Sequence, residues 1–268
     1  MTDYVSRFGL EFNPFLKNAK ETIIETTESK EADTRLSYLS DIKGFGLLTG
    51  SPGRGKTTTA RRWAGRLNPS LFKIVYSSLS TLTVMEFYRN LSEGLGAQPV
   101  HRKADNFKII QNEINRYVLE KKITPVIIID EADHIGHKIL TDLKILFNFD
   151  MDSKDRAVVL LIGLPQLNNT LNLSVHEPLR QRFVMNYHME GMTKEEGKVY
   201  IKKKLESAGC RCPVFDKNAV EAILNASNGT PRLVNKICNI ALLIANSLER
   251  TEVDMESAEK AIRDIQLG

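Results

Sequence analysis

The stretch GSPGRGKTTT (residues 50–59) decides how the rest of this chain is interpreted. It contains a glycine, four further residues and then Gly-Lys-Thr, which is the pattern G-x-x-x-x-G-K-[ST] of a phosphate-binding loop. The apolar run GFGLLTG (44–50) leads into it and helical spacing follows it, so the loop stands between a strand and a helix. In that setting glycines let the backbone wrap around phosphates, and the N–H groups at the helix start point at them. The stretch therefore predicts a nucleotide site.

The residue types in this loop predict ATP and Mg²⁺ as cofactors and predict which residues contact them. Lys56 is expected to reach the β- and γ-phosphates of ATP, and the hydroxyl of Thr57 is expected to ligate Mg²⁺. The backbone N–H groups of the loop would supply the remaining phosphate contacts. The predicted ATP-binding residues are Gly50, Ser51, Pro52, Gly53, Arg54, Gly55, Lys56, Thr57 and Thr58.

An acidic motif, VIIIDE (126–131), ends another apolar run. Asp130, at the carboxyl end of a buried strand, is predicted to hold Mg²⁺ through water, and Glu131 beside it is predicted to polarise the attacking water. An apolar strand that ends in Asp-Glu is only a moderate signal alone. Because it follows Lys56 by 74 residues (130 − 56), the two motifs together predict an ATP-hydrolysing site.

The same segment continues as Asp-Glu-Ala-Asp (130–133), the letters that mark one class of RNA helicase. Such a helicase needs two RecA-like domains, because the second domain supplies half of the nucleotide and RNA site. Only 135 residues follow Asp133 (268 − 133), and their patterns predict one more strand and a helical bundle. We therefore exclude the helicase class.

Strand and helix patterns alternate through residue 163, which predicts a parallel sheet flanked by helices. The later strands are continuous apolar runs, as strands buried on both faces of a parallel sheet are. Beyond about residue 190 only helical patterns follow. We expect an α/β nucleotide-binding domain with an amino-terminal flap over residues 1–188, and a small all-helical lid over 189–268. The expected strands are 44–50, 72–77, 125–130 and 157–163.

Two helix starts carry capping signals. Thr83 and Glu86 form a capping-box pattern in front of an apolar helical stripe. Asp105 is predicted to cap the helix that follows it.

Composition sets few further limits. The 268 residues are 42% hydrophobic and 26% charged, as in ordinary globular proteins, and the net charge of +4 permits a nucleic-acid partner without requiring one. The three cysteines, Cys210, Cys212 and Cys238, favour a reducing compartment, and no second Cys or His pair completes a zinc site. Neither a signal peptide nor an apolar run of about 20 residues is visible, so we expect a cytoplasmic protein with no membrane partner.

The order of these motifs resembles the AAA+ superfamily, in which an α/β nucleotide domain precedes a helical lid. Within it, the chain resembles the ExeA-like, TniB-like and TnsC-like ATPases over nearly its whole length. The resemblance rests on the order and spacing of FGLEFNPF (8–15), GSPGRGKTT (50–58), VIIIDEAD (126–133), AVVLLIG (157–163) with the Pro-Gln-Leu that follows shortly after, LRQRF (179–183), LESAG (205–209) and NGTPRLVNKIC (228–238).

The resemblance implies roles for three arginines. Arg182 falls where these proteins place the residue that reaches a neighbouring subunit's γ-phosphate, and Arg180 could share or take that role. Arg232 corresponds to the lid arginine that senses the γ-phosphate of its own subunit. An arginine that one subunit supplies to its neighbour's nucleotide site, called an arginine finger, implies a homo-oligomer, either a ring or a helical filament. In place of the usual polar sensor after the 157–163 strand, Gln166 is the candidate, so we expect slow or partner-dependent hydrolysis.

The resemblance also implies two main functions. The first is a transposition regulator that oligomerises on double-stranded target DNA with ATP and recruits or activates a transposase. The second is an ExeA-like secretion-pathway ATPase that energises envelope assembly. Because ExeA-like proteins continue into a membrane span and a peptidoglycan-binding region that this sequence lacks, we expect the first. A replication initiator or loader is a third alternative, less favoured because no helix-turn-helix pattern follows the lid.

No dedicated DNA-binding domain is visible, so DNA contacts are expected from loops of the α/β domain. One candidate is SSLSTLT (77–83), which contains Thr81, and the other is QPVHRKAD (98–105), which contains His101, Arg102 and Lys103. Basic side chains in such loops would follow the phosphate backbone.

Overall fold

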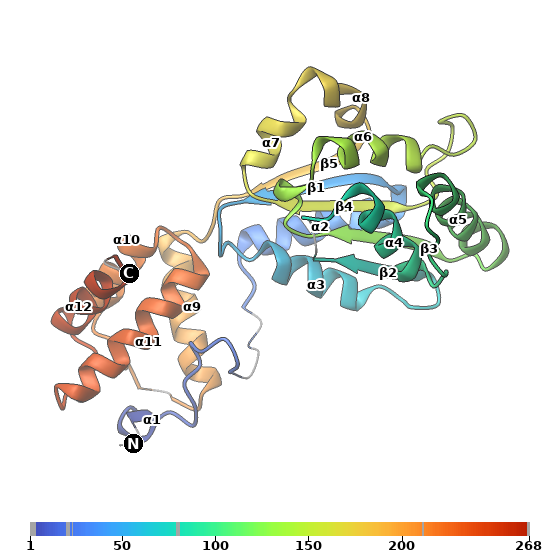
Figure 1. The fold of residues 1–268 in the computed structure, drawn as a ribbon. Coiled ribbons are helices and arrows are strands. Elements are labelled where there is room, and N and C mark those ends of the chain that lie inside the picture. Colours follow the sequence, from blue (N-terminus) through green and yellow to red (C-terminus); the bar gives the residue numbers. More distant parts are fainter. Residues whose placement is uncertain (1–3, 20–21, 23, 79–80, 211, 267–268) are drawn as a thin grey trace. The chain divides into compact units, whose positions relative to one another are not determined.

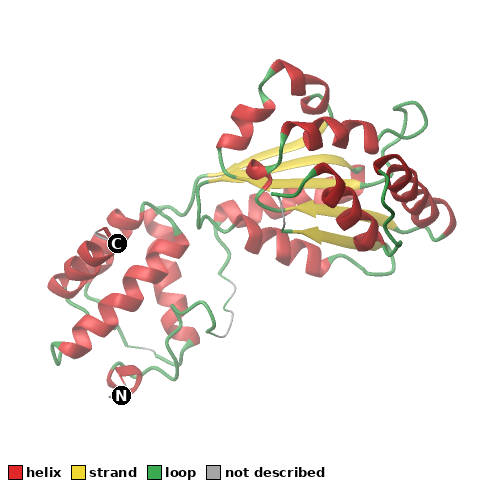
Figure 2. Cartoon of the chain, in the orientation of Figure 1, coloured by secondary structure: helices red, strands yellow, loops and turns green. Residues whose placement is uncertain are grey.

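The computed structural model divides the chain into two compact units, and its described residues are 4–19, 22, 24–78, 81–210 and 212–266. The α/β unit comprises Glu31–Pro52 and Lys56–Met189. The helical unit comprises Met1–Lys30, Gly53–Gly55 and Glu190–Gly268. Figure 2 shows the strands gathered in the first unit, whereas the second consists of helices and loops.

The α/β unit is built on a five-stranded parallel sheet (Figure 1). Its strand order is β2-β3-β4-β1-β5, so the strand that leads into the phosphate-binding loop lies inside the sheet. Strands β1, β3 and β4 are almost wholly buried, as their apolar runs predicted. The strands are β1 (Gly44–Gly50), β2 (Phe72–Ser77), β3 (Thr124–Ile129), β4 (Val158–Gly163) and β5 (Phe183–Met189).

Helices cover both faces of this sheet. On one face α2 and α3 pack against the sheet, and on the other lie α4, α5 and α6 with the shorter α7 and α8. The buried Trp63 of α3 donates its indole N–H to the hydroxyl of Ser40 at 3.0 Å, so its one polar group is satisfied in the core. The helices are α2 (Thr27–Ile42), α3 (Lys56–Arg66), α4 (Val84–Leu95), α5 (Lys103–Asn115), α6 (His137–Leu146), α7 (Gln166–Leu171) and α8 (Glu177–Arg180).

The two capping predictions had different outcomes. The capping box of Thr83 and Glu86 at the start of α4 is confirmed, with both reciprocal hydrogen bonds present. The prediction for Asp105 is wrong, because α5 begins two residues earlier and Arg102 occupies the N-cap without a side-chain bond. Asp105 lies in the first helical turn, where its negative charge interacts favourably with the positive end of the helix dipole.

In the part of the helical unit that the structure describes, the short α1 and four longer helices surround one apolar core. The amino-terminal Phe8, Leu10 and Phe15 are buried in this core, and the N–H of Glu11 donates to the carbonyl of Ala208 at 2.8 Å. The sequence predicts this segment as a flap of the α/β domain, whereas the structure places it in the helical unit. The helices are α1 (Tyr4–Arg7), α9 (Lys194–Ser207), α10 (Lys217–Ser227), α11 (Pro231–Ser247) and α12 (Met255–Gln266).

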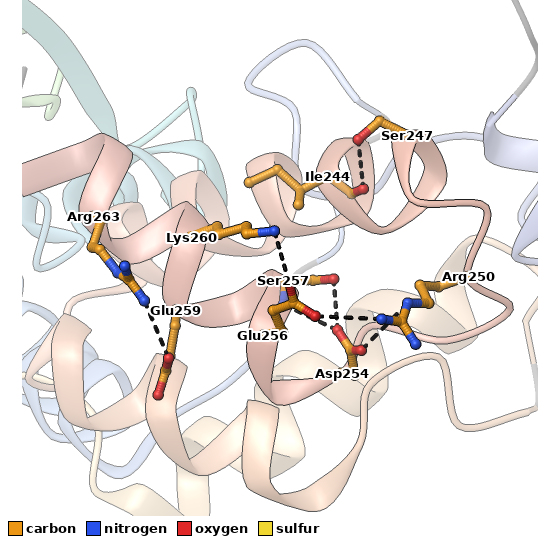
Figure 3. A network of polar contacts seen from close by, with 9 residues as sticks. All are labelled: Ile244, Ser247, Arg250, Asp254, Glu256, Ser257, Glu259, Lys260 and Arg263. Atoms are coloured by element: carbon orange, nitrogen blue, oxygen red, sulfur yellow. Dashed lines mark hydrogen bonds and ion pairs between the residues drawn. The ribbon is translucent and has the colours of Figure 1, made fainter.

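The start of α12 is fixed by a carboxylate (Figure 3). Asp254 accepts hydrogen bonds from the N–H of Ser257 at 3.0 Å and from its hydroxyl at 2.6 Å, and these bonds hold the pKa of Asp254 below its usual value. Arg250 and Lys260 both pair with Glu256 in the same network.

No α-helix in the described part of the chain is long and apolar enough to cross a bilayer.

Candidate nucleotide-binding site

The phosphate-binding loop follows β1 with the backbone shape that its glycines allow. Gly53 and Gly55 have φ angles of 77° and 95°, a left-handed region that costs glycine little. A Cβ built on Gly55 would have no heavy atom within 4 Å, so open space lies beside the loop there. The loop thus offers an open backbone concavity ahead of the N-terminus of α3, which suits an anion.

Lys56 is the first residue of α3, and its ammonium lies back over the loop. Its Nζ donates to the main-chain oxygens of Gly50 at 2.6 Å and Ser51 at 3.1 Å, and the side chain is half-buried. These carbonyls hold a cation at the mouth of the loop. The next residues, Thr57 and Thr58, are exposed on the first turn of α3. The set fits a triphosphate and a hard divalent cation.

Asp130 and Glu131 follow β3 in an unusual local geometry. Asp130 is 6% exposed, and its Oδ1 accepts the N–H of Glu131 at 2.9 Å. Glu131 has φ 53° and ψ 37°, a left-handed conformation that costs a residue with a side chain on the order of 1–3 kcal/mol. This strained turn leaves the Glu131 carboxylate exposed to solvent. A buried carboxylate beside an exposed one fits the predicted division between a metal-holding acid and a water-polarising acid.

Strand order brings these groups to one edge of the sheet. Gly50 ends β1 and Asp130 follows β3, and the two strands are separated only by β4 in a parallel sheet. Their carboxyl ends therefore meet at the same edge, where ligands bind in such folds. Next to Asp130, the buried hydroxyl of Ser77 has no hydrogen-bond partner among the described residues. An unsatisfied polar atom at this edge is consistent with a site built for a hydrated ligand.

Two further polar residues at this edge were not found from the sequence. Asp133, whose side chain is 8% exposed, accepts the N–H of Leu164 at 2.9 Å and so ties the turn after β3 to the end of β4. Asn168 donates to the buried Thr49 of β1 at 3.3 Å, whereas Gln166, the residue proposed as sensor, is exposed at the start of α7. Only the folded chain brings these side chains beside β1 and β4, so their sequence positions carried no signal.

Arg232, the predicted lid arginine, belongs to the helical unit, and its role toward a γ-phosphate stays a prediction. Arg232 is exposed in the first turn of α11, which begins at Pro231. Its main-chain N–H donates to the carbonyl of Gly53 at 3.4 Å. Arg54 donates to the carbonyl of Asn228 at 2.7 Å. Both bonds lie within the helical unit, to which Gly53–Gly55 belong.

The structure treats the two candidate finger arginines differently. The guanidinium of Arg182 donates to the carbonyls of Lys144 at 2.8 Å and Phe147 at 3.0 Å, and it pairs with Asp152 and Asp155 at 3.3 Å each. Its side chain is only 12% exposed. The role of Arg182 toward a neighbour stays a prediction, and these contacts within its own subunit count against it.

Arg180, in contrast, is exposed at the end of α8, and among the described residues its guanidinium hydrogen-bonds only Asn172, with distances of 3.3 and 3.4 Å. Its segment is anchored by a histidine pair. His176 is 1% exposed and stacks on His137 of α6, with His176 Nε2 and His137 Nδ1 2.7 Å apart. Burial, and then the charge of His137, hold the pKa of His176 below its usual value.

The residues predicted to contact DNA are not equivalent either. Arg102 and His101 are exposed, and neither side chain has a hydrogen bond or ion pair within the described ranges. Lys103 pairs with Asp142 at 2.6 Å and lies over the ring of Tyr88 at 5.4 Å. Thr81 is exposed, and residues 79–80 of its loop lie outside the described residues.

Comparison with known proteins identifies the family. Residues 40–171 match the model described as AAA domain. Over 247 residues the chain is 32% identical to General secretion pathway protein A of Aeromonas hydrophila, a match that covers 90% of this chain and 45% of that protein. The chain belongs to the AAA+ ATPases. This AAA+ chain is also 29% identical, over 126 residues, to ATP-dependent target DNA activator B of Escherichia phage Mu, which covers 46% of the chain and 37% of the activator.

The AAA+ fold is shared with proteins of much lower sequence identity. Cdc6p of Pyrobaculum aerophilum superimposes with a TM-score of 0.71 at 14% identity, over 92% of this chain and 69% of that one. The predicted fold class and the predicted resemblance to ExeA-like and transposition ATPases are both confirmed. The match to the AAA domain and the similarity to AAA+ relatives support ATPase activity. This AAA+ chain spans less than half the length of the two curated relatives.

Proposed function

We propose that this AAA+ ATPase assembles on double-stranded DNA with ATP and there recruits or activates a transposase. The observation that carries the proposal is the similarity to a protein named for ATP-dependent activation of target DNA, combined with an exposed Arg102 at the start of α5. DNA binding through phosphate contacts needs only exposed cations repeated along a duplex. An assembly of many subunits supplies that repetition.

In the proposed nucleotide cycle, Lys56 and the loop N–H groups bind the ATP phosphates. Thr57 and Asp130 would hold Mg²⁺, which would supply positive charge to neutralise charge that develops on the phosphates. Glu131 orients and polarises the attacking water, and its exposed carboxylate in a strained turn supports this role. Arg232 is proposed to sense the γ-phosphate from within the subunit.

Completion of the site is assigned to a neighbouring subunit. We assign the finger to Arg180, because it is exposed and makes only long contacts to Asn172, whereas Arg182 is engaged in its own subunit. A guanidinium suits this task because its charge is permanent and its planar fork can bridge phosphate oxygens. The functional unit is accordingly a homo-oligomer, a ring or a helical filament.

A secretion-pathway function is the second candidate. The similarity to General secretion pathway protein A, over 90% of this chain, favours it. Co-sedimentation separates the two candidates when the purified chain is incubated with ATP and either long duplex DNA or isolated peptidoglycan. We expect sedimentation with DNA only. Sedimentation with peptidoglycan and not with DNA would replace the transposition proposal with the secretion one.

A further inference from the structure

Tyr76 lies on β2, at the edge of the sheet that carries the nucleotide site. It pairs in register with Ile128 of β3, so Asp130 stands two residues farther along the neighbouring strand. Side chains two residues apart on one strand share a face. Tyr76 and Asp130 therefore project from the same face of the sheet, which is also the face that packs against α3.

The two side chains meet directly. The hydroxyl of Tyr76 donates a hydrogen bond to Oδ2 of Asp130 at 3.0 Å. The other carboxylate oxygen, Oδ1, accepts the N–H of Glu131 at 2.9 Å. With one donor on each oxygen the plane of the carboxylate is fixed, and each oxygen keeps a lone pair for a further donor such as a metal-bound water.

Core packing does not account for this tyrosine. Its side chain is 53% exposed, although it belongs to a strand whose neighbours Val75 and Ser77 are buried. An exposed ring is not held in place by burial, so the bond to Asp130 is the contact that orients it. Phenylalanine would fill the same volume at this position, and only the hydroxyl distinguishes the two residues.

We propose that Tyr76 is a positioning residue of the nucleotide site, whose hydroxyl holds the Asp130 carboxylate in the orientation that binds hydrated Mg²⁺. Groups that orient metal-holding carboxylates in this way change metal affinity when they are removed. The proposal rests on the assignment of Asp130 as the Mg²⁺-holding residue. Tyr76 itself touches neither nucleotide nor metal, and it acts only through Asp130.

The test compares Tyr76→Phe with the control Tyr38→Phe. Tyr38 belongs to α2, is 57% exposed and is not part of the nucleotide-site motifs. Binding of a fluorescent ADP analogue to the full chain is titrated with Mg²⁺, and the same binding is measured in excess EDTA. Tyr76→Phe should raise the half-saturating Mg²⁺ concentration by about 3- to 10-fold, near the lower end of effects seen at such positions. Affinity in EDTA should not change, and Tyr38→Phe should match the parent in both.

Asp130→Asn and the double variant distinguish the role of Asp130 in holding Mg²⁺ from the role of Tyr76 in positioning Asp130. Asp130→Asn should raise the Mg²⁺ requirement more than Tyr76→Phe does, and adding Tyr76→Phe to it should have no further effect. If Asp130→Asn shifts the requirement and Tyr76→Phe leaves it unchanged or lowers it, the positioning role is refuted while the metal assignment stands. If Asp130→Asn itself has no effect, the metal assignment fails and the role of Tyr76 falls with it.

Discussion

The guanidinium of Arg182 donates a 3.0 Å hydrogen bond to the main-chain oxygen of Phe147, the C-cap residue that follows α6. Its charge also lies 5.1 Å from the ring centre of Phe45 on β1. One side chain, placed directly before β5, thus contacts the end of α6 and strand β1. A group with so many partners inside its own subunit is expected to matter for folding.

Arg182→Ala should destabilise the α/β unit by about 2–3 kcal/mol, because it leaves the part-buried carbonyl oxygens of Lys144 and Phe147 without this donor. Arg180→Ala should leave stability near that of the parent and lower the ATPase rate of the assembled protein. Urea unfolding and steady-state hydrolysis measure the two effects. If Arg182→Ala keeps full stability and loses only hydrolysis, Arg182 is the finger after all.

Mixing experiments test whether the finger acts on a neighbour. Arg180→Ala and Lys56→Ala subunits should each be nearly inactive alone and should regain part of the activity when mixed, since each can lend the intact half of a shared site. Lack of any recovery, at every mixing ratio, would point to a site completed within one subunit.

The fold could be predicted largely because its signals are local. The buried strands β1, β3 and β4 are apolar runs that any reader of the sequence sees, and β1 and β2 have the predicted bounds. β5 was missed because it is an edge strand: FVMNYHM has only two fully buried residues, Met185 and Met189, and no continuous apolar run. Such a strand becomes visible only when β1 is there to pair with it.

The site was predictable where one short segment supplies all of its atoms. The loop from Gly50 to Thr58 is such a segment. The bond between Tyr76 and Asp130 joins residues 54 positions apart, and the contacts of Arg182 depend on where the loop after α6 runs. Lys103 looked like a free cation in the sequence, and its partner Asp142 comes from a different helix. Pairings of this kind are properties of the tertiary structure.

The nucleotide site itself is tested by two substitutions with opposite consequences. Lys56→Ala should abolish ATP binding, because the phosphates lose the cation held at the mouth of the loop. Glu131→Gln should keep ATP affinity and lose at least 10²-fold in turnover, which is the usual scale for a general base. Equilibrium binding of a fluorescent ATP analogue and single-turnover hydrolysis give the two readouts. Turnover by Glu131→Gln at the parent rate would remove Glu131 from its assigned role.

The buried histidine pair predicts a pH dependence of stability. The folded-state pKa of His176 is lowered, so the unfolded chain takes up a proton there at a higher pH than the folded chain does. This contribution to stability is present above the unfolded pKa of about 6.5 and is lost as the pH falls below it. Urea unfolding between pH 7.5 and about pH 5 should show the loss, and His176→Phe should flatten it. His101→Phe, at an exposed position, should leave the parent profile unchanged.

Arg102 and Lys103 are adjacent in the sequence, and we expect them to contribute differently to DNA binding. Arg102→Ala should weaken binding to all duplex sequences alike and reduce its salt dependence, because a phosphate contact carries no base identity. Lys103→Ala should affect DNA binding less and should lower stability by about 1 kcal/mol, since its ammonium pairs with Asp142. Equal losses of DNA affinity in the two variants would show that the ion pair opens when DNA binds.

We propose that ATP assembles this chain on DNA, and fluorescence anisotropy of a labelled duplex measures that assembly. Glu131→Gln, which is expected to hold ATP without turnover, is titrated onto two unrelated duplexes at low and at physiological salt, with ATP or with ADP. We predict tight, salt-sensitive binding to both duplexes with ATP, little binding with ADP, and none by Lys56→Ala in either nucleotide. Absence of binding to either duplex with ATP at low salt would contradict the account.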